Sequence, residues 1–222
     1  MPNTTSQPIE SLGYPEKLFY VASNPNASMF AYQRLSMHRA AAAKQMERIW
    51  AANAESKSSV PVPGPGASHQ DMSPYVEAKR ESMIPVLYET HFYFVTWTGC
   101  RKMLEILVGQ PEFLEAKKIF DSYQNHFDDY SHGRNSFEHF HDRLPGQRGE
   151  GRVKEVRGDP AAGGRRIFFG FKGGNYKHSD SLLDITPASL ELLDSAIDDV
   201  LGVLHRTIDE LIQSKFGFSN ST

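Results

Sequence analysis

Two long segments of this chain carry apolar side chains at a helical spacing. Residues 28–55 contain neither glycine nor proline, and apolar side chains recur there every three or four positions from Met29 to Ile49. After Thr186-Pro187 the same spacing recurs from Leu190 to Ile212. This spacing places the apolar side chains on one face of a helix, which is stable in water only when that face is buried. The chain is therefore predicted to be mainly α-helical.

Two further helices are predicted between these segments. Ser73-Pro74 is typical of a helix start, and the pattern that follows continues to Val108, where Gly109 is placed to end it. Pro85 is expected to kink this helix, because proline cannot donate to the helical hydrogen-bond ladder.

Another helix should open at Pro111 and continue past Phe127. Glycine costs about 1 kcal/mol in a helix interior. We therefore expect a break or bend at Gly133 and a short helix that restarts near Arg134 and ends before Pro145-Gly146.

Two segments have the composition of connections. Residues 56–72 are rich in proline, glycine and serine, which predicts a flexible linker. Residues 146–181 are rich in glycine and contain the strand-like run 166–171, which predicts a small β-hairpin insertion before the last helix. The predicted architecture is a single domain over residues 1–222, an antiparallel four-helix bundle that buries all four apolar stripes. The last helix could also use part of its stripe to form a dimer.

Charge and cysteine content restrict the class of protein. The formal net charge is −3, which provides no general attraction to nucleic acid or anionic membranes. Cys100 is the only cysteine, so an intrachain disulfide is excluded and an intracellular location is favoured. The first residues lack the order of a signal peptide, and the most apolar stretch, 84–99, is too short to span a bilayer. We expect a cytoplasmic protein that does not bind membranes.

The polar residues with catalytic potential are concentrated between His126 and Asp142. On a helix, a single face would hold Asn135, Glu138, His139 and Asp142, with Arg134 next to it. A neutral histidine, with an ordinary pKa of about 6.5, can accept the proton of a ribose 2′-hydroxyl near neutral pH. An arginine fork can bind a phosphate and stabilise the charge of its transition state. This combination is suited to cleavage of RNA without a metal ion.

The motif Arg134-Asn135-x-x-x-His139 resembles that of the HEPN superfamily, in which an arginine and a polar residue precede a histidine near the start of a helix. The resemblance implies an all-α bundle that usually dimerises, with two motifs in one cleft, and many members are metal-independent ribonucleases of toxin or anti-phage systems. It implies His139 as general base, Arg134 as phosphate clamp and Asn135 as orienting residue. The supporting residues are Glu138, His141 and Asp142.

The wider pattern from Arg134 to Arg143, followed by the glycine-rich segment and Asp184-Ile185-Thr186-Pro187, is also similar to bacterial helical proteins of unknown function. One departure concerns regulation. Some toxin members carry a tyrosine two residues after the histidine, and His141 stands there in this chain. An antitoxin that modifies this tyrosine is therefore not implied.

Other interpretations of the same residues remain open. Arg134 and Glu138 have the four-residue spacing of an ordinary helical ion pair, so the chain could instead be a non-catalytic, partner-binding bundle. Glu138-x-x-His141 and Asp129-x-x-His132 have the ligand spacing of carboxylate-bridged metal bundles. Such sites need pairs on two helices, whereas both of these pairs lie in one segment, and we predict no metal or other cofactor. The basic insertion, represented by Arg165, Arg166 and Lys172, is a candidate RNA-binding segment.

Overall fold

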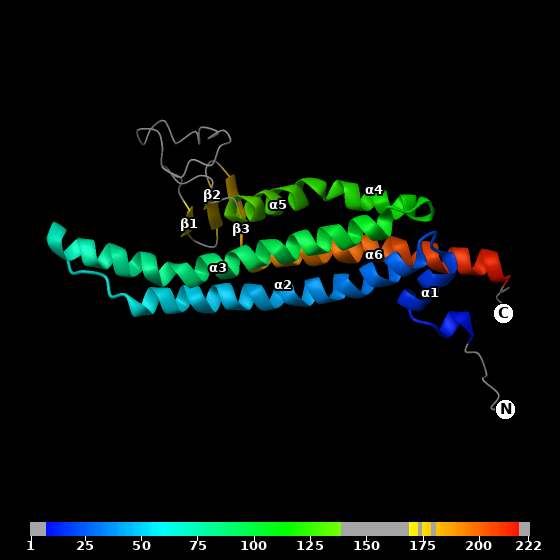
Figure 1. Ribbon diagram of the computed structural model, residues 1–222, viewed down its shortest axis with the longest axis horizontal. Helices are drawn as coiled ribbons and strands as arrows, with labels where there is room; N and C mark the ends of the chain where they lie inside the picture. The colour runs from blue at the N-terminus through cyan, green and yellow to red at the C-terminus, as the bar shows by residue number, and fades with distance from the viewer. Residues whose placement is uncertain (1–7, 139–168, 173–174, 179–180, 218–222) are drawn as a thin grey trace, which may run out of the picture. The chain divides into compact units, whose positions relative to one another are not determined.

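A computed structural model describes residues 8–138, 169–172, 175–178 and 181–217 (Figure 1). The described part is mainly α-helical, as predicted. In chain order the elements are η1 (Ile9–Ser11), α1 (Tyr14–Val21), α2 (Pro25–Ser59), α3 (His69–Val108), η2 (Pro111–Phe113), α4 (Leu114–Ser122), α5 (Gln124–Glu138), β1 (Phe169–Lys172), β2 (Asn175–His178), β3 (Ser181–Asp184) and α6 (Pro187–Phe216). The predicted end of α3 at Val108 and the predicted start of α6 at Pro187 are both confirmed.

The packing divides the chain into two compact units, each assembled from several segments. Unit 1 comprises Met1–Arg39, Gly99–His126 and Leu193–Thr222, and unit 2 comprises Ala40–Thr98 and Phe127–Leu192. Because α2, α3, α5 and α6 each contribute to both units, a unit boundary falls inside each of these helices.

Unit 1 buries the apolar faces of α1, α6 and parts of α2, α3 and α4. Its largest fully buried side chains are Leu18, Leu35, Leu104, Leu107 and Phe113. Polar contacts surround this core: Arg39 reaches Asp194 at 2.7 Å and Asp198 at 2.5 Å. Lys17 reaches Asp209 at 2.9 Å. Three aspartates of α6 are therefore paired with basic side chains within the unit.

Unit 2 is built around aromatic side chains of α3 and α5. Trp97 stacks on Tyr130 with 3.9 Å between ring centroids, and Phe127 packs edge-on against Trp97 at 5.6 Å. The strands form an antiparallel sheet in the order β1-β2-β3, with Phe171 opposite Tyr176 and Tyr176 opposite Leu183. Leu183 and Ile185 are buried. The sheet lies beside α5 (Figure 1). Of the predicted insertion, residues 146–168 lie outside the described residues.

The connection predicted over residues 56–72 is shorter in the structure, because α2 runs to Ser59 and α3 begins at His69. Tertiary contacts hold the last turn of α2. The buried Ser56 hydroxyl lies 2.8 Å from that of Ser82, and Lys79 Nζ donates to the Ser56 carbonyl at 2.6 Å. The predicted helix start at Ser73-Pro74 is wrong, since Pro74 lies inside α3, where it removes one hydrogen bond early in the helix.

The predicted restart of a helix near Arg134 is also wrong. The helix is continuous through Gly133, and the chain instead breaks at Tyr123, between α4 and α5. The Tyr123 N–H bonds back to the Phe120 carbonyl at 3.0 Å, and its hydroxyl donates to Asp199 at 2.6 Å. A tertiary contact therefore accompanies the break. No sequence signal for a helix end marks this position.

Glycine is needed at position 133 for close packing. A Cβ atom built there would lie 2.6 Å from Leu183 Cδ1 and 2.9 Å from Phe94 Cε2. Both distances are shorter than van der Waals contact, so only glycine lets α5 approach α3 and β3 this closely. Gly133 has no side chain to obstruct this contact. The helix remains continuous despite the low helix propensity of glycine.

Candidate functional site

The described part of the predicted site lies at the end of α5. Arg134, Asn135 and Glu138 are in its last turns. The other predicted members, His139, His141 and Asp142, lie outside the described residues, as do Arg165 and Arg166 of the predicted RNA-binding segment. Lys172 ends β1, where its backbone is described.

Arg134 is held by two neighbours on its own helix. Its Nη2 donates to Asn135 Oδ1 at 2.8 Å, and its Nε lies 3.3 Å from Glu138 Oε1. The Nε atom is buried, and the contact with Glu138 is an ion pair without hydrogen-bond alignment. The Arg134 side chain is 24% exposed. In the described part of the chain, no residue accepts a hydrogen bond from Nη1. Among the described residues, the Nη edge of Arg134 therefore has Asn135 as its hydrogen-bond acceptor.

The helix that carries Arg134 is fixed by the core of unit 2. Tyr130, one turn earlier, is stacked on Trp97 and donates its hydroxyl proton to the Asp184 carbonyl at 2.5 Å. Burial raises the pKa of Tyr130, so the hydroxyl stays protonated and keeps donating. Gly133 contacts Phe94 and Leu183 directly. The backbone of Arg134 therefore belongs to a helical turn that the core holds in place. This limits the positions that the Arg134 side chain can reach.

His91 of α3 also belongs to this site, although the sequence suggests it, with Glu89, only as a weak contributor to a metal site. The contacts between α3 and α5 run antiparallel: Phe127 meets Trp97, Tyr130 meets both Trp97 and Phe94, and Gly133 meets Phe94. One further turn along this register brings the end of α5 to His91.

The electrostatics of His91 agree with this register. Burial lowers the pKa of His91, the negative charge of Glu138 opposes that effect, and the positive charge of Arg134 adds to it. The imidazole is half-buried, with its Nδ1 atom fully buried. In the sequence His91 stands inside an aromatic run that predicts core packing, and only the pairing of α3 with α5 places it beside Arg134.

Metal binding gains no support from the described residues. Glu89 lies close to His91 in the sequence, and its Oε2 atom is buried without a hydrogen-bond partner in the described part of the chain. However, no group of three or more histidine, cysteine, aspartate or glutamate side chains with metal-binding geometry occurs among the described residues.

Unit 1 contains a second polar cluster, around His205 of α6. Its ring stacks on Tyr14 with 3.6 Å between centroids, and its Nε2 lies 2.8 Å from the Tyr32 hydroxyl. Tyr14 and Lys17 both donate to Asp209 at 2.9 Å. Each of these groups is satisfied by the others, and together they fasten α1 to α2 and α6. This is the pattern of a structural network.

Cys100 belongs to the core of unit 1. The thiol is buried, and burial raises its pKa to about 12, so it is protonated at neutral pH. A protonated and inaccessible thiol is a poor nucleophile.

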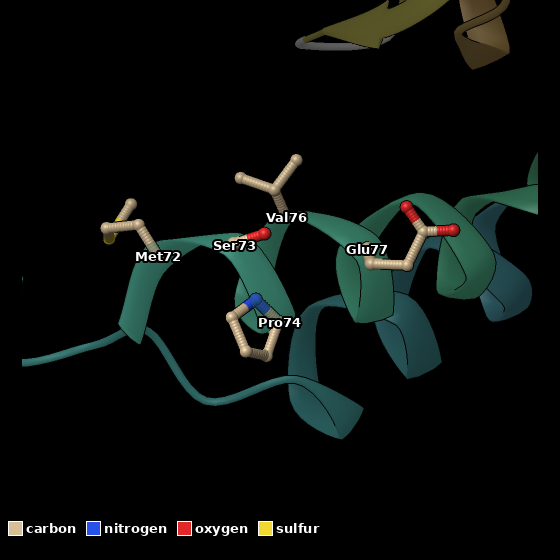
Figure 2. A pocket seen from close by; sticks show the side chains of 5 residues that line it. All are labelled: Met72, Ser73, Pro74, Val76 and Glu77. Carbon is tan, nitrogen blue, oxygen red and sulfur yellow. The ribbon is translucent and has the colours of Figure 1, made fainter. Parts of the chain in front are cut away.

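A shallow concavity lies at the start of α3, lined by Met72, Ser73, Pro74, Val76 and Glu77 (Figure 2). Glu77 is the only ionisable side chain in that lining, and it pairs with Arg80 of the same helix at 3.7 Å. Fourteen residues of α3 separate Glu77 from His91, which is about 21 Å along a helix. The concavity is therefore separate from the Arg134 site.

No protein-family model, curated protein or solved structure matches this chain. Among the described residues, no helix is both long enough and apolar enough to cross a membrane.

Proposed function

We propose that the chain is a metal-independent endoribonuclease of HEPN type, acting as a homodimer in a toxin or defence context. The observation that supports it best is the state of Arg134. Its Nε is buried on the side of Glu138, and its Nη edge keeps donors without a described acceptor. This arrangement fixes the orientation of the fork and leaves the edge that binds a phosphate in bidentate fashion.

The proposed reaction needs only groups of this chain and the RNA itself. His139 accepts the proton of a 2′-hydroxyl, and the oxygen attacks the adjacent phosphorus while the bond to the 5′-oxygen breaks. The 5′-oxygen leaves as a hydroxyl by taking up a proton, and His139 returns to its neutral form by releasing the proton that it accepted. Arg134 stabilises the added negative charge of the transition state, and Asn135 orients the phosphate. The products carry 2′,3′-cyclic phosphate and 5′-hydroxyl ends. Supporting roles go to Glu138, His141 and Asp142, and no cofactor is required.

The proposal keeps the predicted framework, an antiparallel four-helix bundle with a basic β-hairpin insertion. In it, Arg165, Arg166 and Lys172 contact the RNA backbone, and dimerisation places two motifs in one cleft.

The test is cleavage of total tRNA in the presence of EDTA. Removal of one oriented charge at a developing oxyanion typically costs about 10²- to 10³-fold in rate, and we expect this loss for Arg134→Ala. Arg134→Lys should recover little, because lysine lacks the fork. Arg80→Ala is the matched control, since Arg80 also pairs with a glutamate of its own helix, Glu77, at 3.7 Å. Equal activity of wild type and Arg134→Ala would refute the proposal.

Loss of the Arg134–Glu138 ion pair alone would not unfold Arg134→Ala. The two side chains of the Arg134–Glu138 pair are 24% and 44% exposed, and such helical surface pairs contribute only about 0.3–0.5 kcal/mol to stability. Circular dichroism of the variant should match that of wild type.

The same ion pair favours a second candidate, a non-catalytic partner-binding bundle in which Arg134 and Glu138 only stabilise the end of α5. A stable, dimeric wild type that cleaves no RNA would support this candidate. Cleavage that EDTA abolishes would instead support the carboxylate and histidine metal site.

A further inference from the structure

The exposed side of α3 is apolar over about four turns. Between residues 84 and 98, every exposed residue is apolar or aromatic, and none of them carries a charge. We refer to these exposed residues as the α3 stripe, and they are Ile84, Pro85, Tyr88, Phe92 and Val95. A helix face that meets water is normally polar, so the α3 stripe indicates a contact surface.

The α3 stripe lies on the side of the helix away from α5. Trp97 faces α5, where its ring stacks on that of Tyr130. With 3.6 residues per turn, Tyr88 and Phe92 lie about 140–180° around α3 from Trp97. The α3 stripe is therefore separate from the Arg134 site at the end of α5.

The size of the α3 stripe suits a protein contact. Tyr88 and Phe92 are 62% and 51% exposed, and because an aromatic side chain has about 150–250 Å² of surface, these two alone leave about 170–280 Å² in water. Ile84 and Val95, 44% and 36% exposed, extend this surface in both directions along the helix. Exposed apolar patches larger than a few hundred Å² mark interaction sites. The stripe is about 17 Å long and one residue row wide, which is the shape that another helix covers with its own apolar side chains.

The charged side chains of this part of α3 are acidic. Glu81 is exposed and precedes Ile84 by three residues, on the same side of the helix. Glu89 borders the α3 stripe and is half-buried, and its Oε2 atom accepts no hydrogen bond in the described part of the chain. Residues 81–98 contain no lysine or arginine. The surface is therefore complementary to a partner that presents both apolar and basic side chains.

A second copy of this chain fits the α3 stripe less well. A two-fold axis between Tyr88 and Phe92 would bring each flank of the helix against the same flank of the other copy. The two Glu89 carboxylates would then oppose each other across the contact, and like charges in such positions disfavour association. The same glutamates disfavour binding to an anionic membrane, which attracts basic segments.

We propose that the α3 stripe binds a basic amphipathic helix of a different protein. The apolar side chains of the partner pack on Tyr88 and Phe92, and a lysine or arginine of the partner pairs with Glu89. This inference goes beyond the proposed ribonuclease and does not depend on it, because the α3 stripe shares no residue with the Arg134 site.

The test uses two designed helical peptides as probes. Both carry the same leucine stripe, flanked by lysines in one peptide and by glutamates in the other, and fluorescence anisotropy of a fluorescein label measures the Kd for the full chain. The lysine peptide should bind at least about tenfold more tightly than the glutamate peptide. Tyr88→Ala and Phe92→Ala should each weaken its binding at least about tenfold, as expected for aromatic side chains at the centre of a contact. Glu89→Gln keeps the shape without the charge and should weaken binding of the lysine peptide about tenfold.

Phe30→Ala is the matched control, because Phe30 is 52% exposed and lies in unit 1, outside the α3 stripe. It should bind the lysine peptide like wild type. Because the substituted aromatic side chains are exposed, all these variants should have the circular dichroism spectrum of wild type.

Three results would overturn the inference. The first is equal affinity for the two peptides, or a wild-type Kd in both Tyr88→Ala and Phe92→Ala. The second is a wild type that sediments as a dimer and a Phe92→Ala variant that sediments as a monomer, which would make the α3 stripe a contact between copies. The third is Phe92-dependent co-sedimentation with vesicles of phosphatidylglycerol and phosphatidylcholine, which would assign the surface to membranes. None of these measurements involves RNA cleavage, so failure of this inference is distinguishable from failure of the proposed ribonuclease.

Discussion

Alanine at position 133 should destabilise the protein, whereas alanine at position 202 should stabilise it. Both glycines lie inside helices, so each substitution should contribute about 1 kcal/mol of helix propensity. At Gly202 a Cβ atom meets nothing within 4 Å, so the full gain should appear. At Gly133 the Cβ atom would lie 2.6 Å from Leu183 Cδ1 and 2.9 Å from the Phe94 ring.

The cost at Gly133 depends on what can move. The Leu183 methyl group is the end of a flexible side chain, but the buried Phe94 ring is confined by Tyr130, 5.8 Å away between centroids. Overpacking of this kind typically costs about 1–3 kcal/mol, which cancels or exceeds the propensity gain. We therefore expect the free energy of unfolding of Gly133→Ala to be about 1–3 kcal/mol lower than that of Gly202→Ala.

Urea denaturation followed by circular dichroism measures this difference, and thermal melts provide a second reading. For a chain of this size, each kcal/mol corresponds to about 2–4 °C in Tm. If Gly133 were only a helix breaker, as its sequence context predicts, both variants would be stabilised equally. Equal stabilisation would refute the packing role of Gly133.

Three further predictions concern single side chains. Burial lowers the pKa of His205, so the imidazole binds a proton more tightly in the unfolded chain than in the folded one. The stability due to neutral His205 should therefore be lost as the pH falls below about 6.5. Urea midpoints at pH 7.5 and 5.5 should therefore differ more for wild type than for His205→Gln, and identical differences would contradict this. Cys100 is buried and its pKa is raised to about 12, so its thiol should react with iodoacetamide at pH 8 only after urea unfolds the chain. Mass spectrometry detects the labelled protein, and rapid labelling of the folded protein would show that Cys100 is not buried. Tyr130→Phe should cost about 1 kcal/mol through loss of the bond to the Asp184 carbonyl, whereas Tyr88→Phe should be neutral, and urea titrations compare the two.

The helices could be predicted from the sequence because their signals are local. The apolar spacing after Pro187 predicts α6, and Gly109 correctly predicts the end of α3. The errors arise where tertiary contacts override local preference. Ser56 extends α2 through its contacts with α3, and Tyr123 ends α4 where its hydroxyl reaches Asp199.

In the candidate site, too, some residues could be predicted from local sequence and others depend on tertiary contacts. Arg134, Asn135 and Glu138 could be grouped from helical spacing alone, and the structure places the three together. The position of His91 beside Arg134 could not be predicted, because His91 lies 43 residues before Arg134 and has no motif of its own. Its place depends on the register between α3 and α5, which is set by contacts such as Trp97 on Tyr130.

Gly133 connects stability to the site, because it immediately precedes Arg134. The close approach of α5 to α3 at Gly133 determines how near the next turn, with Arg134 and Glu138, comes to His91. If Gly133→Ala pushes the helices apart, the imidazole becomes more exposed, and its pKa should rise toward that of an ordinary histidine. Titration of His91 by NMR would detect this shift, with Gly202→Ala as the variant that leaves it unchanged. If Gly133→Ala destabilises the protein but leaves the pKa of His91 unaltered, the spacing of the helices at Gly133 does not control the site.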